Sequence, residues 1–318
     1  MKIAATAGEI EAILAAMAAV ASCRGKVPLT DLDRTTLTAA GHYFFALEGP
    51  LDLAGMRDLT PDQLARAVTS QDLRRQTTCF LAVMPFVDGV VDRDKVALVE
   101  SYAAALGIAD DFLVDIHEAA LGNLRWAGMD MVRHNMLSIT HKMWDEADVM
   151  PWLLPYQGTA RDPALTQRFH DLEQLPPGTL GYDFWHHYTT HGFTFPGEEN
   201  ALNAVFAVPH DTTHLLSDYN TSYTGEILVS TFTAGMHPHE PMSGHILPVL
   251  FSWHLGIQLL EAPGSHKGAL DPVHFWEAWA RGQGMTTDVF APDWDFWAHI
   301  HQPIKSLKAA YGVPPKEG

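Results

Sequence analysis

The sequence predicts an all-α fold made of two helical domains, each a multi-helix bundle. Apolar residues recur at three- and four-residue spacing in nearly every segment, and the alternation typical of strands is almost absent. Helix starts are well marked, as at residues 60–63 (TPDQ) and at Asp92, where a capping residue precedes a helical pattern. Gly107 marks an equally clear helix end. Packed helices are therefore expected to form the core.

The expected helices fall into two groups on either side of a boundary region. Residues 149–163 contain three prolines, a glycine and little periodicity, so we place the boundary near 150–160. The first domain then covers residues 1–150 and the second covers residues 151–318. The expected helices are 5–22, 30–47, 61–84, 92–106, 110–147, 163–172, 179–191, 198–217, 222–236, 244–261, 272–282 and 294–311.

The N-terminal stretch predicts a first amphipathic helix and not a signal peptide. It carries one early lysine, and Glu9 and Glu11 interrupt its apolar residues. The longest apolar run, from His245 to Leu260, includes polar side chains and a proline, and it is short for a membrane span. We therefore expect a buried helix in that run.

Charge and cysteine content exclude several classes of protein. The formal net charge of −18 would repel nucleic acid, and it leaves apolar surface as the means of holding the chain at a membrane. Two cysteines, Cys23 and Cys79, argue against a disulfide framework and against a cysteine-based zinc site. We expect a cytoplasmic homo-oligomer that binds no nucleic acid and contacts the inner face of the membrane peripherally.

An acidic loop between two helices stands out in the first half. Residues 87–94 (VDGVVDRD) connect a helix ending near Phe86 to a helix that ends in Leu-Gly. This arrangement resembles the tellurite-resistance TerB-like helical domain over residues 60–125. Lys95 stands where that family usually has a glutamate, and an acidic loop needs its carboxylates to bind a cation.

The simpler interpretation of this loop is structural. Asp88 would cap a turn, Gly89 would supply a left-handed backbone conformation, and Asp92 would cap the next helix. The first half of the chain is then a structural or partner-binding module.

The segment with the clearest chemistry is PHDTTH, residues 209–214. On a helix, His210 and His214 project from the same face one turn apart, so both imidazoles can approach one divalent ion. Pro209 is compatible with a helix that begins nearby but not with a helix interior. Asp211 is rotated by roughly 100° from His210, so it ligates only near a helix end or else orients a histidine.

Glu226 supplies a further carboxylate if the next helix packs back against the first. A turn is expected at residues 218–221, and the helix after it carries Glu226. Two histidines with one or two carboxylates leave coordination positions free for water or substrate, which is the composition of a catalytic site. The predicted metal-binding and catalytic residues are His210, Asp211, His214 and Glu226.

His-Asp-x-x-His followed by eleven residues and a glutamate resembles the signature of the ubiquinone (coenzyme Q) biosynthesis Coq-four family. That family is assigned a zinc ion on these four positions. Residues 175–181, 225–227, 280–282 and 294–313 resemble further segments of the family, so the resemblance covers about residues 163–313. The histidine-rich turn at 236–245 and the fused first half depart from the family pattern.

The resemblance implies a reaction on a polyprenylated hydroxybenzoate, a precursor of the benzoquinone. The ring carboxylate would be removed oxidatively, with hydroxylation of the same ring carbon, and the protein would help to organise other quinone-biosynthesis enzymes. Zinc alone transfers no electrons, and two histidines with carboxylates also suit ferrous iron, so Zn²⁺ and Fe²⁺ both stay open. Access for the prenyl tail predicts an exposed apolar patch near the metal.

Two other functions are compatible with the same residues. A non-catalytic scaffold would bind the prenyl lipid and present quinone intermediates to other enzymes, with a structural metal. A metal hydrolase unrelated to quinones is the third hypothesis, although no glutamate lies between the two histidines as in His-Glu-x-x-His proteases.

Most other histidines have an ordinary explanation. The chain has 18 histidines and 14 of them follow residue 160, so histidine alone identifies no site. Those at 186, 187 and 191 are expected to be surface or satisfied core residues, and those at 237, 239 and 245 to be hydrogen-bonding loop residues. His254, on an apolar helix, is expected to be a buried neutral imidazole.

Overall fold

The prediction of an all-α fold is confirmed. The structure is a computed structural model that describes residues 4–49, 51–53, 55–56, 58–140, 161–258 and 265–317. Within these ranges every regular element is a helix, and the two isolated bridges, Thr179 with Pro303 and Leu255 with Lys267, extend into no strand. None of the described helices combines the length and the apolar character that a membrane crossing requires.

The described residues form the following helices, given in chain order. They are α1 (Ala7–Ala21), α2 (Asp31–Phe45), α3 (Pro61–Ala67), α4 (Gln71–Val83), η1 (Met84–Phe86), α5 (Arg93–Leu106), α6 (Phe112–Ala120), α7 (Leu124–Thr140), α9 (Pro163–His170), η2 (Asp171–Gln174), α10 (Leu180–His191), α11 (Ala204–Ser217), α12 (Tyr223–Met236), the π-helix η3 (Pro241–Ile246), α13 (Leu247–Trp253), α14 (Pro272–Gly284), α15 (Phe296–His299) and α16 (Ile304–Ala310).

Helix starts follow the predicted capping chemistry. The Thr60 hydroxyl accepts from the amide of Gln63 and the Gln63 side chain accepts from the Thr60 amide, with Pro61 in the first turn of α3. Asp92 caps α5, which ends at Gly107 in the left-handed conformation. These local signals set where the first-half helices begin and end.

The expected first-half helices were too long in two places. The segment 61–84 is broken at Val68, whose extended backbone separates α3 from α4, and Ser70 caps the new start. The segment 110–147 is broken at Gly122, which has φ +89° between α6 and α7. The part of that segment beyond residue 140 lies outside the described residues.

Three second-half helices also differ from expectation. The helix expected over 198–217 begins only at Ala204, where Asn203 caps it. The helix expected over 244–261 opens as a π-helix and ends at Trp253, because Gly256 has φ +71° and the Ile257 amide bonds back to Phe251. The segment expected over 294–311 consists of two short helices, α15 and α16, separated by residues 300–303.

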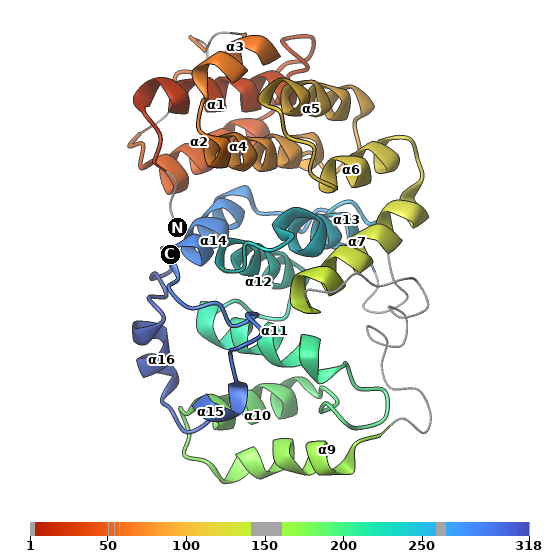
Figure 1. Cartoon of the computed structure of the whole chain (residues 1–318), viewed down its shortest axis with the longest axis vertical. Coiled ribbons are helices and arrows are strands. Elements are labelled where there is room, and N and C mark those ends of the chain that lie inside the picture. Colours follow the sequence, from red (N-terminus) through yellow and green to blue (C-terminus); the bar gives the residue numbers. More distant parts are fainter. Residues whose placement is uncertain are drawn as a thin grey trace.

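The helices stack in three layers, which Figure 1 shows from top to bottom. Helices α1–α6 form the upper layer, α12, α13 and α14 the middle one, and α9, α10, α11 and α15 the lower one, while α7 descends beside the middle layer. A cluster of buried apolar residues joins the upper and middle layers, and a second cluster fills the lower part. The upper and middle layers therefore share one core.

The shared core brings together aromatic rings from both halves of the chain. Phe80 of α4 lies 5.0 Å from the ring of Trp276 and 5.3 Å from that of Trp279, both on α14. All three side chains are almost fully buried. The predicted boundary at 150–160 lies outside the described residues, so the division into two domains stays a prediction.

The acidic loop at residues 87–94 has the structural role given by the simpler interpretation, in which its aspartates cap a turn and a helix. Asp88 accepts from the Lys95 ammonium at 2.8 Å and from the Val90 amide, and Gly89 has φ +77°. Lys95 is buried, so the cation that this loop contacts is its own side chain. No cation site is indicated in this loop.

His254 is a buried neutral imidazole, as expected. Its Nδ1 accepts from the Leu270 amide, so its Nε2 carries the proton that it donates to the Val87 carbonyl. Burial lowers the pKa of His254, which keeps the ring neutral. This bond also fastens the acidic loop to the second half of the chain.

The Phe80→Ala variant should lose about 3–5 kcal/mol of unfolding free energy, because it opens a cavity against two tryptophans. Unfolding in urea, followed by tryptophan fluorescence and circular dichroism, should give one transition shifted as a whole. Val114→Ala, at a side chain that is 47% exposed, should stay within about 0.5 kcal/mol of the parent chain. A second transition that kept the parent midpoint would show instead that the second half is stable by itself.

Candidate metal centre

A short turn places the two candidate ligand helices against each other. Helix α11 ends at Asp218, in the left-handed conformation, and Ser222 caps α12 by accepting from the Gly225 amide. A Cβ on Gly225 would lie 1.9 Å from the Asn220 carbonyl oxygen, so only glycine allows this approach. Glu226 therefore enters in the first turn of α12, facing α11.

Pro209 lies inside α11 and not before it, which corrects the expectation. The helix begins at Ala204, so Pro209 falls in its second turn. Proline removes the hydrogen bond that residue 209 would donate to the Val205 carbonyl, and this normally disfavours a helix interior. Beyond it, Thr213 donates its hydroxyl proton to the Pro209 carbonyl at 2.8 Å. The His210–His214 pair thus starts directly after a weakened turn.

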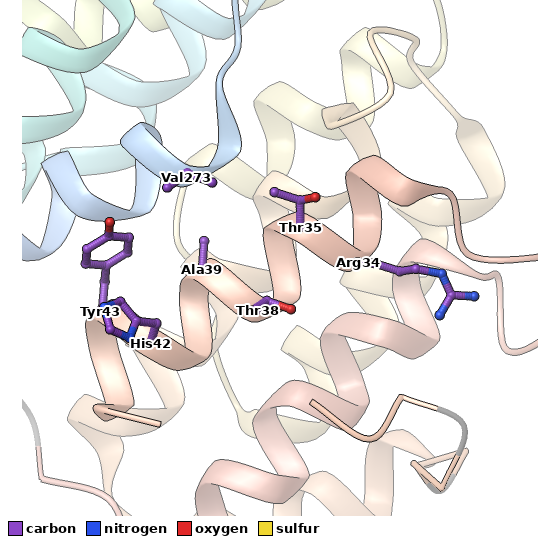
Figure 2. Close-up of a pocket in the computed structure, with 7 residues that line it drawn as sticks. All are labelled: Arg34, Thr35, Thr38, Ala39, His42, Tyr43 and Val273. Carbon is purple, nitrogen blue, oxygen red and sulfur yellow. The ribbon is translucent and has the colours of Figure 1, made fainter. Parts of the chain in front are cut away.

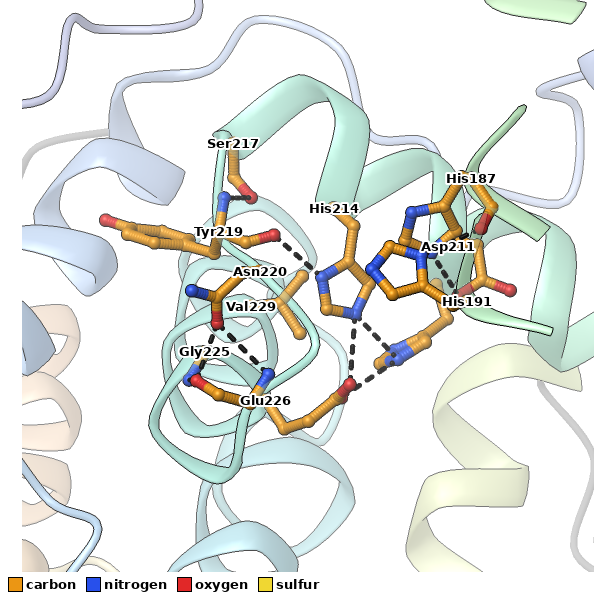
Figure 3. Close-up of polar contacts among 12 residues, drawn as sticks. His187, His191, Asp211, His214, Ser217, Tyr219, Asn220, Gly225, Glu226 and Val229 are labelled. Carbon is orange, nitrogen blue, oxygen red and sulfur yellow. Dashed lines mark hydrogen bonds and ion pairs between the residues drawn. The ribbon is translucent and has the colours of Figure 1, made fainter. Parts of the chain in front are cut away.

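His210, His214 and Glu226 converge on one point. The two imidazole Nε2 atoms lie 3.3 Å apart. Glu226 Oε2 is 3.3 Å from His210 Nε2, and Oε1 is 3.4 Å from His214 Nε2. Figure 3 shows the Glu226 carboxylate reaching up toward the His214 ring. The antiparallel return that the prediction required does bring this carboxylate to the histidine pair.

The environment holds Glu226 charged. Burial alone would raise the pKa of Glu226, but its contacts with His210 and His214 outweigh burial and lower the pKa well below its usual range. Burial would lower the pKa of His214, and contact with Glu226 raises it instead. Either a proton shared with a ring nitrogen or a bound cation would stabilise a buried carboxylate that faces two imidazoles.

The ring of His214 is oriented by the turn. Its Nδ1 donates to the Tyr219 carbonyl at 2.9 Å, so the lone pair of Nε2 points toward His210 and Glu226. The His214 side chain is 2% exposed, whereas His210 and Glu226 keep 16% and 17%. His210 and Glu226 therefore keep some contact with solvent, whereas His214 is enclosed by the protein.

Asp211 points toward α10. The Tyr188 hydroxyl donates to its Oδ2 at 2.6 Å, and His187 Nε2 is 3.8 Å from its Oδ1. Burial would raise the pKa of Asp211, but His187 and the nearby imidazoles outweigh it and the pKa is lowered. A carboxylate oxygen of Asp211 still lies within 4.8 Å of ligand atoms of both His210 and His214. The closest contacts of Asp211 are thus with α10, and its role, as a ligand or as an orienting residue, stays a prediction.

His187 was expected to be a surface or satisfied core residue, and it belongs to this group. Its ring stacks on that of His214 at 5.6 Å, and its Nε2 is buried with no hydrogen-bond partner among the described residues. His191 bonds through Nδ1 to the His187 carbonyl and lies beside it in Figure 3. The four-residue spacing of these two histidines was the one signal in the sequence that could have pointed to them.

His237 and His245, two of the three histidines expected to be hydrogen-bonding loop residues, are hydrogen-bonded, although His245 lies in η3. His237 bonds to Asp288 through Nδ1 at 2.6 Å and to the Ser138 carbonyl through Nε2. His245 Nε2 lies 2.8 Å from the Ser138 hydroxyl oxygen, and burial lowers the pKa of His245 well below its usual value. These rings fasten α7 to the turn after α12.

The converging atoms of His210, His214 and Glu226 lie at distances compatible with a shared divalent ion. Ligand atoms about 2.0–2.1 Å from a tetrahedral zinc ion stand roughly 3.3–3.4 Å from one another. The two Nε2 atoms are 3.3 Å apart, and each faces a different oxygen of Glu226, at 3.3 Å for His210 and 3.4 Å for His214. These three residues would therefore hold such an ion, with the Glu226 carboxylate facing both imidazoles.

Several apolar side chains, here called the apolar rim, contact the histidines or belong to the segment that leads into His210. The Phe206 ring stacks on His210 at 5.0 Å, and Phe193 packs against His187 and His191. Phe193 is 40% exposed, and Leu202 and Val205, on the segment leading into His210, are 42% and 50% exposed. The apolar residues Ile227, Phe232 and Phe251 of α12 and α13 are buried in the core and are not part of this rim.

A separate groove lies on the upper layer. It has a volume of about 360 Å³ and lies between α2 and the start of α14, as Figure 2 shows. Its lining residues are Arg34, Thr35, Thr38, Ala39, His42, Tyr43 and Val273. None of the four predicted site residues lines it, and one helix face supplies nearly all of its walls.

The chain matches no protein-family model and no curated protein. The likenesses to the Coq-four and TerB-like families therefore rest on the motifs quoted above.

The Tyr188→Phe variant should lose about 1–3 kcal/mol of unfolding free energy, because the buried Asp211 carboxylate loses its closest donor. Tyr182→Phe, on the same helix and partly exposed, is the matched control and should change stability little. Chemical denaturation followed by circular dichroism measures both. Equal stability of the two variants would mean that Asp211 does not depend on the Tyr188 hydroxyl.

Proposed function

We propose that this chain binds one divalent metal ion through His210, His214 and Glu226 and acts on a polyprenylated hydroxybenzoate in quinone biosynthesis. The observation that carries the proposal is the convergence of two imidazole Nε2 atoms and the Glu226 carboxylate at 3.3–3.4 Å, built from the His-Asp-x-x-His and glutamate pattern. Behind the histidine pair, Asp211 of α11 accepts from the Tyr188 hydroxyl of α10. The reaction is oxidative decarboxylation with hydroxylation of the same ring carbon.

The donor set is compatible with two metals. Two imidazoles and a carboxylate suit zinc, and the same set with open positions suits ferrous iron in oxygen-using enzymes. A bound divalent ion would supply positive charge to stabilise a carboxylate or phenolate oxygen of the substrate. Iron would in addition take part in electron transfer, which zinc cannot do.

The apolar rim supports a hydrophobic substrate. Phe206 covers one face of His210, and the exposed Phe193, Leu202 and Val205 extend apolar surface from the cluster outward. Burying each methylene of a prenyl tail contributes roughly 0.8 kcal/mol, so tail contacts would dominate affinity. The same rim is the surface through which we propose peripheral contact with a membrane.

The balance of the reaction fixes the co-reactants. The carboxyl group leaves as carbon dioxide, and one oxygen atom of dioxygen becomes the new ring hydroxyl. The other oxygen atom is reduced to water, so two electrons and two protons must come from an added reductant. The assay therefore needs dioxygen, a reductant and the loaded metal.

Incubation of the iron- or zinc-loaded full chain with a prenylated hydroxybenzoate should release carbon dioxide only when oxygen and reductant are present. His210→Ala should abolish this release, because it removes one of the two imidazoles that face Glu226. His186→Ala, at an exposed position on α10, should retain it. Carbon dioxide release and hydroxylated product are measured together.

The alternative function is a scaffold that binds prenyl lipid and presents quinone intermediates to other enzymes. The exposed rim favours this function as much as it favours catalysis. Tight binding of the prenylated acid without turnover under either metal would select the scaffold. Absence of both turnover and binding would reject the quinone proposal and leave a metal-dependent hydrolase as the next hypothesis.

Metal affinity should respond to the residues in a fixed order. Glu226→Gln should weaken Zn²⁺ binding most, because it removes a ligand charge, and Asp211→Asn should weaken it by about 10–100-fold through loss of orientation. Asp218→Asn, at the exposed end of α11, should leave affinity unchanged. Competition with a chromophoric chelator gives the affinities. A larger loss for Asp211→Asn than for Glu226→Gln would make Asp211 the principal carboxylate ligand.

A further inference from the structure

A second cluster of metal-ligating side chains lies where α6, α7 and η3 meet. Asp115, Asp130 and His134 each offer a ligand atom, and these atoms lie within 4.8 Å of one another. Asp115 comes from α6, and the other two come from α7. The cluster shares no residue with the candidate metal centre on α11 and α12.

Asp115 is the residue that points to a ligand. It is 0% exposed, and its Oδ2 accepts from the Ser243 hydroxyl of η3 at 2.6 Å. Its Oδ1 is buried and has no hydrogen-bond partner among the described residues. A buried carboxylate oxygen without a donor is strongly unfavourable, so it requires a proton or a cation that the protein itself does not supply.

Two neighbouring side chains, Asp130 and His134, offer ligand atoms within 4.8 Å of a carboxylate oxygen of Asp115. His134 is 5% exposed, and its Nδ1 lies 2.9 Å from the Asp130 carbonyl oxygen. A ring nitrogen bonded to a backbone carbonyl is the usual orienting contact of a metal-ligating histidine. Asp130 uses Oδ1 to bind Arg133, and its Oδ2 is 3.5 Å from His134 Nδ1.

The charges at this junction are predominantly negative. Asp111 Oδ2 lies 3.3 Å from His134 Nε2, and Glu240 precedes η3 in the left-handed conformation. Burial raises the pKa of Glu240, the charge of His134 lowers it, and Asp111 raises it. Three carboxylates, those of Asp111, Asp115 and Asp130, thus lie near the His134 imidazole, which favours binding of a divalent cation.

The backbone at this junction is closely packed and irregular. The Asn135 side-chain amide donates to the Gly244 carbonyl at 2.7 Å, and a Cβ on Gly244 would lie 3.3 Å from the His134 carbonyl oxygen. Ser243 and Gly244 belong to a π-helix, a conformation found most often at functional sites. The close approach fixes Ser243 and His134 relative to Asp115.

We propose that Asp115, Asp130 and His134 bind a second divalent cation, of the Mn²⁺ or Zn²⁺ class. Two carboxylates and one imidazole are ligands that both ions accept. The ion would join α6 and α7 beside η3, and so connect first-half helices to the second half of the chain. It would act on stability and lie apart from the chemistry proposed at His210.

The competing explanation is a single proton held between Asp115 and Asp130. Burial, as the largest effect, raises the pKa of Asp115 to about 7, and the Asp130 charge raises it further. Asparagine at position 115 reproduces the neutral form of this carboxyl group. The Asp115→Asn variant therefore separates the two explanations.

The test uses the full chain, stripped of metal with a chelator, in a His210→Ala/Glu226→Gln background that removes the first site. Titration with MnCl₂ or ZnCl₂ in a calorimeter should show one ion bound per chain, and thermal unfolding should shift upward with the ion. Adding Asp115→Asn, or separately His134→Gln, should abolish both the binding and the shift. Asp110→Asn, whose carboxylate pairs with Arg75 outside the cluster, should retain them.

Two results would overturn the proposal. One is a stripped protein that binds no ion in the background variant, and the other is ion binding that persists in both Asp115→Asn and His134→Gln. Circular dichroism establishes that each variant is folded. Because Asp115 and His134 lie on different helices, one variant still tests the proposal if the other fails to fold. A different result is one ion bound by the unsubstituted chain that is lost in Asp115→Asn and His134→Gln but kept in His210→Ala/Glu226→Gln. That result would support the site at Asp115 and reject the metal centre proposed at His210.

Discussion

The structure of the candidate centre depends on one interaction, the Glu226 carboxylate set against two imidazoles. A partly buried charge of this kind is stable only with its partners in place, because loss of one partner leaves an uncompensated charge. The turn between α11 and α12 keeps Glu226 beside these partners, because Gly225 has no side chain and Ser222 caps α12. Small changes in this turn would therefore disturb the cluster more than they disturb the fold.

Sequence reasoning succeeded where the relevant contacts are local. The spacing of His210 and His214 is fixed by helix geometry, and Glu226 follows within one short turn, so both could be placed from the sequence. His187 could not, because its contact with Asp211 depends on how α10 packs against α11. Asp115 and Ser243, 128 residues apart, meet for the same non-local reason. Helix ends were missed where a single backbone conformation, as at Gly256, overrides apolar periodicity.

The two halves of the chain are joined by several kinds of contact. Phe80 packs against Trp276 and Trp279, and His254 donates to the carbonyl of Val87 in the acidic loop. In the acidic loop, the Lys95 ammonium binds the Asp88 carboxylate that a metal cation would otherwise need. The loop therefore has a packing role. The first half therefore contributes to the shared core, and the cation site proposed for it lies where α6 approaches η3.

Pro209 gives α11 an unusual distribution of rigidity. Because residue 209 has no amide proton, the Val205 carbonyl lacks its partner from within the helix, and the first turn is held mainly by the cap at Asn203. Phe206, whose ring covers His210, belongs to that turn. Fraying of these few residues would uncover the imidazole without disturbing His214, which is anchored by Tyr219 farther along the helix. Helix α11 thus holds His214 firmly, whereas the turn that covers His210 is held by fewer backbone hydrogen bonds.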